Sequence, residues 1–300
     1  MRVRSRQAGV RALHAFLVLA IAAPCSGQAR DSVSVTFRPW HVLEGTLAEV
    51  ALRGSSDSGD SVAGVVAGEP LHFEWSQDQR VWWALMPVPL GSSDSLDVAL
   101  IVRRAADPSD TLAERLAVRP RHEALQVLHL PAPYNRPPDS AAVVRLGADA
   151  ARLDTIWREA HGIPRLWHEP FLRPVPGRVT TVFGEGREID GMSEPRHQGV
   201  DLAGAKGSVV HAANRGIVAA VTSLYESGLT VILDHGAGLV TAYGHLSEAT
   251  VAVGDTVARG QVLGHVGVSG RVTGPHLHWA AFYGALAVDP LSLLDIRSVP

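Results

Sequence analysis

The sequence contains almost no cysteine and almost no lysine. Cys25 is the only cysteine and Lys206 is the only lysine in the 300 residues. A single thiol excludes an intrachain disulfide, so the stability of the chain has to come from packing or from a metal ion. The formal net charge is −3, which excludes the strongly basic composition that is typical of nucleic-acid-binding proteins.

Long hydrophobic runs are also missing, with one exception near the N-terminus. Residues 12–23 form an apolar run that follows several arginines and precedes small residues. This pattern is typical of a secretory signal peptide, which we assign to residues 1–29. The run is shorter than the ~20 residues of a membrane span, although an N-terminal anchor is the alternative. Because Pro24 precedes Cys25, lipidation is not expected, and we predict an exported protein of the periplasm or the extracellular cell envelope.

The N-terminal half reads as short strands separated by turns. Alternating apolar residues predict strands at 32–37, 47–52, 71–75, 81–86, 96–102 and 111–118. This pattern predicts an immunoglobulin-like β-sandwich over residues 30–120. Aromatic and histidine side chains here offer a binding surface, for example to a cell-envelope protein, but ordinary packing in a sheet is the simpler interpretation of His41, His72, Trp82 and Trp83.

Residues 121–170 are predicted to connect two domains. Several prolines over 121–137 indicate a linker, and a helix is expected over 139–161 with Asp139 or Ser140 as its N-cap. Gly162 and Pro164 are expected to end this helix. It can pack on the following domain, and we raise the hypothesis that it shields a cleft there.

From Phe171 onward the chain changes to short β-branched segments separated by glycines. Strands are predicted at 179–183, 217–221, 230–234, 239–243, 251–253, 256–257 and 262–266. Gly236-Ala237-Gly238 is expected to join two of them as a hairpin. The segment 251–264 also suits a biotinyl or lipoyl carrier, but the only lysine, Lys206, lies far upstream of it, so a carrier function is not favoured.

Histidines in this half have a spacing suited to a metal. His197 and Asp201 lie four residues apart around Gly199, and Gly-Pro precedes His276-Leu277-His278. Residues i and i+2 of a strand point to the same face, so both imidazoles of the second motif can face one site. His197, Asp201 and His278 can supply two nitrogens and one oxygen, which leaves the fourth position of a tetrahedral zinc ion open for water.

A zinc site that hydrolyses peptide bonds needs, besides the metal, groups that move a proton and stabilise the oxyanion. His276 shares the strand face of His278, and His245 is expected at the end of the strand over 239–244. The remaining histidines of this region lack a partner pattern and are interpreted as structural: His161, His168, His211, His235 and His265.

Together these motifs resemble the lysostaphin/LytM-type zinc metallopeptidases. The resemblance covers about residues 171–292 and rests on His197-x-x-x-Asp201, Tyr243-Gly244-His245-Leu246 and Gly274-Pro275-His276-Leu277-His278. It implies a duplicated hybrid-motif β-domain over 171–300 that cleaves the peptide stems or bridges of peptidoglycan. It also implies that His197, Asp201 and His278 bind Zn²⁺ and that His245 and His276 are catalytic.

Two other functions fit the same motifs. Some members of this family have lost ligands and only activate a cell-wall amidase, but here the ligand set is complete. A metallopeptidase that acts on elastin-like or Gly-rich proteins is the second alternative, because specificity depends on loops such as 185–195 and 224–228. Trp279, where the family commonly has Phe, and Arg271, in a variable position, are the departures, and neither affects the expected metal ligands.

Overall fold

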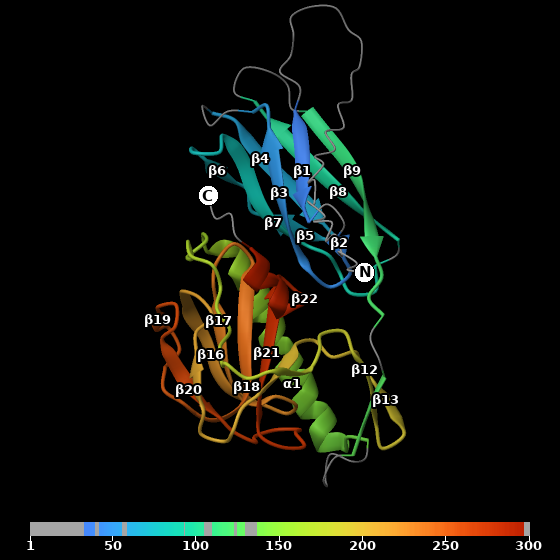
Figure 1. Ribbon diagram of the computed structural model, residues 1–300, viewed down its shortest axis with the longest axis vertical. Helices are drawn as coiled ribbons and strands as arrows, with labels where there is room; N and C mark the ends of the chain where they lie inside the picture. Colours follow the sequence, from blue (N-terminus) through green and yellow to red (C-terminus); the bar gives the residue numbers. More distant parts are fainter. Residues whose placement is uncertain are drawn as a thin grey trace, which may run out of the picture.

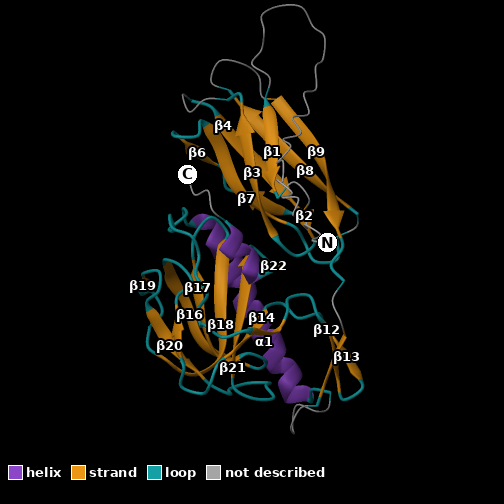
Figure 2. Cartoon of the chain, viewed as in Figure 1, coloured by secondary structure: helices purple, strands orange, loops and turns teal. Residues whose placement is uncertain are grey.

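The computed structural model describes most of the chain, and the described residues form a mainly β protein, as the sequence predicts (Figure 2). These residues are 33–39, 42–55, 59–92, 94–104, 110–122, 125–129 and 137–296. The predicted signal peptide over 1–29, including Cys25, lies outside them, as does His41. Within the described ranges, no helix has the length and apolar character needed to cross a membrane.

The N-terminal unit consists of two sheets (Figure 1). One has the order β1-β3-β7-β6 and the other the order β2-β9-β8-β4-β5. Every second side chain of β8 from Leu96 to Val102 is buried, so one face of its sheet carries the apolar residues into the core. The strands are β1 Ser34–Arg38, β2 Val42–Leu43, β3 Leu47–Arg53, β4 Ser61–Val66, β5 Glu69–Leu71, β6 Glu74–Ser76, β7 Val81–Pro87, β8 Ser95–Arg103 and β9 Asp110–Arg119.

Most strands predicted in this unit are confirmed with small changes at their ends. The prediction of one strand over 71–75 is wrong, because the chain crosses from one sheet to the other at residues 72–73, between β5 and β6. β4 was not predicted, because Ala63 and Gly64 interrupt its apolar alternation. The immunoglobulin-like arrangement of these two sheets stays a prediction.

The connecting region contains more regular structure than a linker. Residues 125–128 form β10 (Leu125–Leu128), which pairs in parallel with β12 (Gly186–Ile189) of the C-terminal half, so the prediction of a plain linker is wrong there. The predicted helix is α1 (Ser140–Glu159), and Asp139 Oδ1 caps it by accepting from Ala142 N at 2.9 Å. A 3₁₀ turn, η1 (Ala160–Gly162), ends it as expected.

The C-terminal unit is one large sheet with the main order β11-β14-β21-β18-β17-β16-β19. β20 pairs with β18, β15 pairs with β20, and β22 pairs with β21. β12 and β13 form a separate small sheet with β10. The strands not yet defined are β11 Val179–Thr181, β13 Met192–Glu194, β14 Val200–Ala203, β15 Val209–His211, β16 Gly216–Leu224, β17 Gly228–Asp234, β18 Leu239–Ala249, β19 Thr256–Val257, β20 Val262–Val266, β21 His276–Tyr283 and β22 Leu286–Val288.

The predicted strands of this unit are confirmed except one. Residues 251–253 belong to no strand, because they lead into a turn in which the Asp255 carboxylate accepts from Ala252 N at 2.8 Å. Gly236-Ala237-Gly238 joins β17 to β18, as predicted. After β22 the described chain closes with the 3₁₀ helix η2 (Pro290–Asp295).

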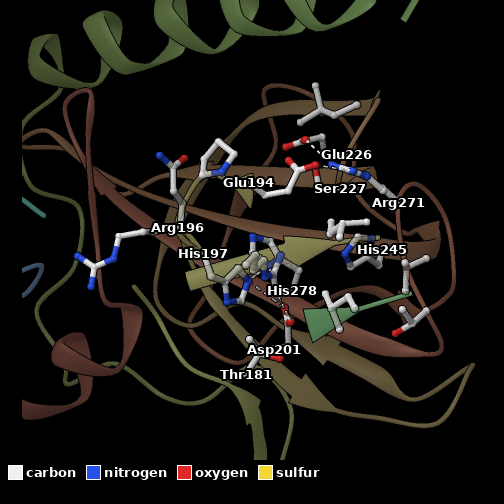
Figure 3. Close-up of a pocket in the computed structure, with 18 of the residues that line it drawn as sticks. Thr181, Glu194, Arg196, His197, Asp201, Glu226, Ser227, His245, Arg271 and His278 are labelled. Atoms are coloured by element: carbon white, nitrogen blue, oxygen red, sulfur yellow. Dashed lines mark hydrogen bonds and ion pairs between the residues drawn. The ribbon is translucent and has the colours of Figure 1, made fainter. Parts of the chain in front are cut away.

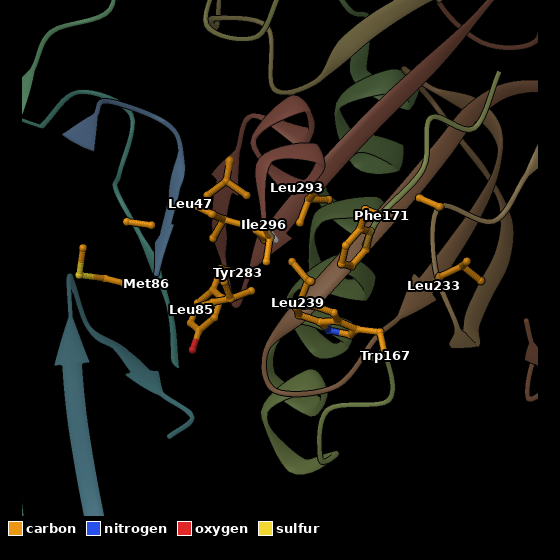
Figure 4. Close-up of a cluster of buried hydrophobic side chains, with 14 of the residues drawn as sticks. Leu47, Leu85, Met86, Trp167, Phe171, Leu233, Leu239, Tyr283, Leu293 and Ile296 are labelled. Atoms are coloured by element: carbon orange, nitrogen blue, oxygen red, sulfur yellow. The ribbon is translucent and has the colours of Figure 1, made fainter. Parts of the chain in front are cut away.

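The two units share one hydrophobic cluster. Figure 4 shows Leu47 of β3 close to Leu293 of η2, within a group of buried side chains from both halves. A buried ion pair accompanies it, in which Arg121 Nη2 donates to Asp289 Oδ2 at 2.9 Å. The expected energetic consequence is that the units stabilise each other.

Candidate metal centre

Three neighbouring strands bring the predicted site residues together. In the sheet, Asp201 of β14 is paired with His278 of β21, and His278 is paired with Gly244 of β18 on its other side. Directly paired residues of antiparallel strands have Cβ atoms ~5 Å apart. The register therefore puts the carboxylate of Asp201 beside the imidazole of His278.

His197 reaches the same place from the segment that precedes β14. Its backbone N–H donates to Glu185 O at 2.9 Å, and its carbonyl accepts from Gly184 N at 2.8 Å, which fixes the segment. A Cβ atom at Gly199 would lie 2.7 Å from His278 Cε1, so only glycine allows this close approach. The expectation of a loop or strand here, rather than a helix, is confirmed.

The three donor atoms converge on one point. His278 Nδ1 lies 3.0 Å from His197 Nε2 and 3.0 Å from Asp201 Oδ1, and His197 Nε2 lies 3.2 Å from the same carboxylate oxygen. Together they form a group whose donor atoms all lie within 4.8 Å of one another. His197 Nδ1 donates to Val182 O at 3.1 Å, which leaves its Nε2 lone pair directed at the group.

His245 approaches the group through an irregularity in β18. The prediction that the strand ends at this residue is wrong, because β18 continues to Ala249. The register with β17 shifts across Gly244 and His245, and His245 has a positive φ of 60°. A bulge redirects a side chain. A non-glycine residue adopts a positive φ, which is strained, only where the surrounding structure enforces it. Here the bulge turns the His245 ring toward His276 and His278.

The pair of histidines on β21 is separated by the register. His276 is paired with Ala203 of β14, two pairs beyond the Asp201–His278 pair, so it lies at the side of the donor group. Its Nε2 is 3.5 Å from Asp201 Oδ1, and its ring centroid is 4.8 Å from that of His245. Nδ1 of His276 donates to Gly274 O, and Nδ1 of His245 donates to Ser269 O, so Nε2 of both rings is free to face the site.

Burial and the neighbouring charges set the protonation of the site. Burial lowers the pKa of His197 to about 4, and burial together with His278 and His276 lowers the pKa of His245 to about 3. Burial opposes ionisation of Asp201, but the adjacent imidazoles of His197 and His278 outweigh it and hold the pKa of this carboxyl well below its usual range. At neutral pH the site therefore presents one carboxylate and neutral imidazoles at His197 and His245.

The group lies in the wall of a cavity of about 590 Å³ (Figure 3). Both segments proposed for specificity contribute, through Glu194 and Glu226 among others. The prediction of a loop over 185–195 is wrong, because β12 and β13 lie within it. Helix α1 contributes Leu146 and Leu153, so the helix forms part of the cavity wall, as the shielding hypothesis requires. The remaining wall contains residues of β10, β12 and the segment before β21.

Two arginines near the site, Arg187 and Arg271, were not predicted from the sequence to belong to it. Arg187 of β12 donates from Nη2 to Asp201 Oδ2 at 3.0 Å. Arg271 donates from Nη2 to Glu194 Oε1 at 2.7 Å, which connects the segment before β21 with β13. No local motif marks Arg187, because the contact depends on how the small sheet lies beside β14. Arg271 stands four residues before Pro275, and that nearness was the available signal.

The histidines interpreted as structural lie away from the donor group. His235 is buried and shares hydrogen bonds with Arg215 O and Thr241 Oγ1. His161 lies where the two units meet, bonded to Glu69 and His72. Among the described residues, the group of His197, Asp201 and His278 is the one set of at least three such side chains with converging donor atoms.

Residues 195–290 match the sequence profile of peptidase family M23. This segment is an M23 peptidase domain. It contains all five predicted site residues, and the resemblance inferred from the sequence motifs is confirmed at the level of the family. A solved structure of a Pseudomonas aeruginosa protein assigned to peptidase M23 aligns with 84% of this chain and 94% of its own, with 26% identity and a TM-score of 0.63. That similarity therefore extends beyond the M23 domain into the N-terminal half.

Curated relatives match within the M23 domain. The DD-carboxypeptidase/endopeptidase Mpg of Neisseria meningitidis serogroup B is 38% identical over 97 residues, which cover 32% of this chain and 22% of Mpg. The peptidoglycan DD-endopeptidase ShyA of Vibrio cholerae is 41% identical over 83 residues, which cover 28% of this chain and 19% of ShyA. The chain thus spans about a fifth of the length of these relatives.

Proposed function

We propose that this protein is an exported zinc metalloendopeptidase that hydrolyses peptide bonds in the cross-links of peptidoglycan. The observation that carries the proposal is the convergence of two imidazole nitrogens and one carboxylate oxygen within 4.8 Å, beside a cavity and two further imidazoles. The M23 relatives named as endopeptidases support the reaction type. ShyA, which is named as a peptidoglycan DD-endopeptidase, supports the substrate class.

The donor set fits zinc. Ligands at the usual distances of ~2.0–2.1 Å from a tetrahedral zinc ion lie roughly 3.3 Å from one another, and the donor atoms of His197, Asp201 and His278 lie 3.0–3.2 Å apart. Two nitrogens with one oxygen leave the fourth position open, as in catalytic zinc sites. A zinc ion held by these residues would act as a Lewis acid that polarises a peptide carbonyl and acidifies water.

His245 and His276 are proposed as the catalytic pair. Each has its Nδ1 proton engaged by a backbone carbonyl, so each presents Nε2 to the cavity as a proton acceptor. One ring can take the proton of the attacking water and return it to the leaving amine, while the other, once protonated, can donate to the oxyanion. The 4.8 Å between the ring centroids supports a role for both rings at one scissile bond.

The domain plan belongs to the same proposal. It comprises a signal peptide over 1–29, an N-terminal immunoglobulin-like domain over 30–120, a connecting region over 121–170 and the peptidase over 171–300. The N-terminal domain is proposed to contact a protein of the cell envelope. The similarity to the Pseudomonas aeruginosa structure over 84% of the chain supports a shared arrangement of the two β units.

Digestion of purified peptidoglycan by the full-length protein tests the function. Mass analysis of the products should show cleaved stem or bridge peptides, the cleavage should stop with a chelator, and added zinc should restore it. Absence of cleavage by zinc-loaded protein would contradict the proposal and favour activation of an amidase. Cleavage that is insensitive to the chelator would contradict the use of zinc.

A further inference from the structure

The carboxylate of Asp201 divides its two oxygens between different partners. Oδ1 faces the nitrogens of His197 and His278, where a metal would be held. Oδ2 accepts from Arg187 Nη2 at 3.0 Å. A carboxylate that is free to rotate can offer a metal one oxygen or both, so a partner on Oδ2 restricts which arrangement it adopts.

The contact between Arg187 and Asp201 is specific. Within the described part of the chain, Arg187 Nη2 bonds to Asp201 while Arg187 Nε is buried without a hydrogen-bond partner. The position of the guanidinium is therefore set by its hydrogen bond to Asp201, and the guanidinium Nε contributes no further hydrogen bond. The Asp201 side chain is only 8% exposed and that of Arg187 23%, so water screens this ion pair weakly.

The small sheet holds Arg187 in place from two sides. Arg187 is paired with Glu194 of β13 on one side and with Gln126 of β10 on the other. β10 belongs to the segment between the two units, so this segment supports the residue that reaches the metal site. A side chain on a strand between two neighbours is better fixed than one on a free loop.

We propose that Arg187 is a positioning residue that holds Asp201 as a one-oxygen metal ligand. The inference rests on the proposed zinc site. Arg187 acts through Asp201 and contacts neither the donor nitrogens nor the reacting atoms. Its positive charge opposes the binding of a cation, so the proposal requires that the gain from orienting the carboxylate exceeds this repulsion. The two effects predict opposite changes in zinc affinity when Arg187 is replaced.

Zinc affinity of the full-length protein, measured by competition with a chromophoric chelator, decides between them. Arg187→Gln should weaken zinc binding by about 10–100-fold, and Arg187→Lys should recover part of the loss. Arg271→Gln is the matched control, because it removes the same charge from the same cavity without contacting Asp201. Zinc affinity in this control should stay close to that of the unmodified protein.

Two results would overturn the positioning role. One is zinc affinity in Arg187→Gln that equals or exceeds that of the unmodified protein. The other is an equal loss in Arg187→Gln and Arg271→Gln, which would reveal a general effect of charge. Thermal unfolding of each variant checks that the fold is retained. Failure of the unmodified protein to bind zinc would instead refute the proposed function, so the two failures are distinguishable.

Discussion

Two clusters of histidine and carboxylate lie in this protein, and they are built differently. In the candidate metal centre, the atoms of His197, Asp201 and His278 converge on one point beside a cavity. At the junction of the two units, Glu69, His161 and His72 form a chain: His161 Nε2 donates to Glu69 Oε2 at 2.9 Å, and His72 lies 2.8 Å from His161 Nδ1. The same residue types can therefore form either a converging or a linear arrangement.

The destination of each ring nitrogen explains the difference. In the candidate metal centre, backbone carbonyls accept from the outer nitrogens of His197, His245 and His276, so the inner nitrogens keep their lone pairs for a ligand. In the junction cluster, the hydrogen bonds run from ring to ring and from ring to carboxylate, so both nitrogens of His161 are already used. We expect the first cluster to support activity and the second to support stability.

Replacement of His278 should show the largest difference between the roles of the two clusters, because it should affect zinc binding and activity but not stability. His278→Ala removes a donor nitrogen, so zinc stoichiometry and peptidoglycan cleavage should both fall to background, while the free energy of unfolding of the metal-free protein changes by less than about 1 kcal/mol. Cleavage is measured by product mass analysis and zinc by elemental analysis. Undiminished cleavage would show that the converging cluster is not the metal site.

His245→Ala sharpens the division of roles within the metal centre. Because His245 is proposed to move protons and not to bind the metal, kcat/KM should fall by about 10²–10⁴-fold at unchanged zinc stoichiometry. His265→Ala, a half-buried histidine on β20, serves as the control and should keep its activity. Loss of zinc together with activity in His245→Ala would mean that ligand and helper are wrongly assigned.

The junction cluster should show the opposite behaviour. His161→Ala leaves the Glu69 carboxylate, which is 16% exposed, without its imidazole partner, so the free energy of unfolding should fall by about 2 kcal/mol. The zinc stoichiometry should be unchanged. Chemical unfolding measures the first quantity, with the exposed His168→Ala as control. An unchanged stability would remove the structural role assigned to the linear cluster.

A carboxyl group near the junction gives the smallest effect, and it depends on pH. Burial raises the pKa of Asp234 to about 6, against the hydrogen bond from Gly236 N and the charge of His161, while Glu159 adds to the rise. The folded protein therefore binds this proton more tightly than the unfolded chain, and stability falls as the pH rises through about 6. Asp234→Asn should raise the free energy of unfolding at pH 7.5 by roughly 1–3 kcal/mol.

The gain from Asp234→Asn should disappear below about pH 4, where the native carboxyl is protonated in both states. The neighbouring His235, whose pKa burial lowers to about 4, is present in both proteins, so its contribution cancels in the difference. Asp295→Asn, at an exposed position, should show no comparable gain. A gain of equal size at pH 4 and pH 7.5 would contradict the pH dependence.

Much of the protein follows from its sequence alone. The alternation of apolar residues marks most strands, Asp139 and Gly162 delimit α1, and the spacing of His197 to Asp201 and of His276 to His278 identifies the candidate ligands. These features are local: a period of two residues decides which face of a strand a side chain occupies, and a cap needs only a neighbouring turn. Local patterns therefore sufficed for most elements and for the choice of candidate site residues.

Tertiary structure alone decided how those residues are arranged. The register of β14, β21 and β18 places His278 opposite Asp201 and His276 two pairs away, and a bulge in β18 aims His245 at both rings. The pairing of β10 with β12, and the contact of Arg187 with Asp201, likewise bring together residues far apart in the chain. Register between strands depends on the packing of the whole sheet, and no local spacing in the sequence encodes it.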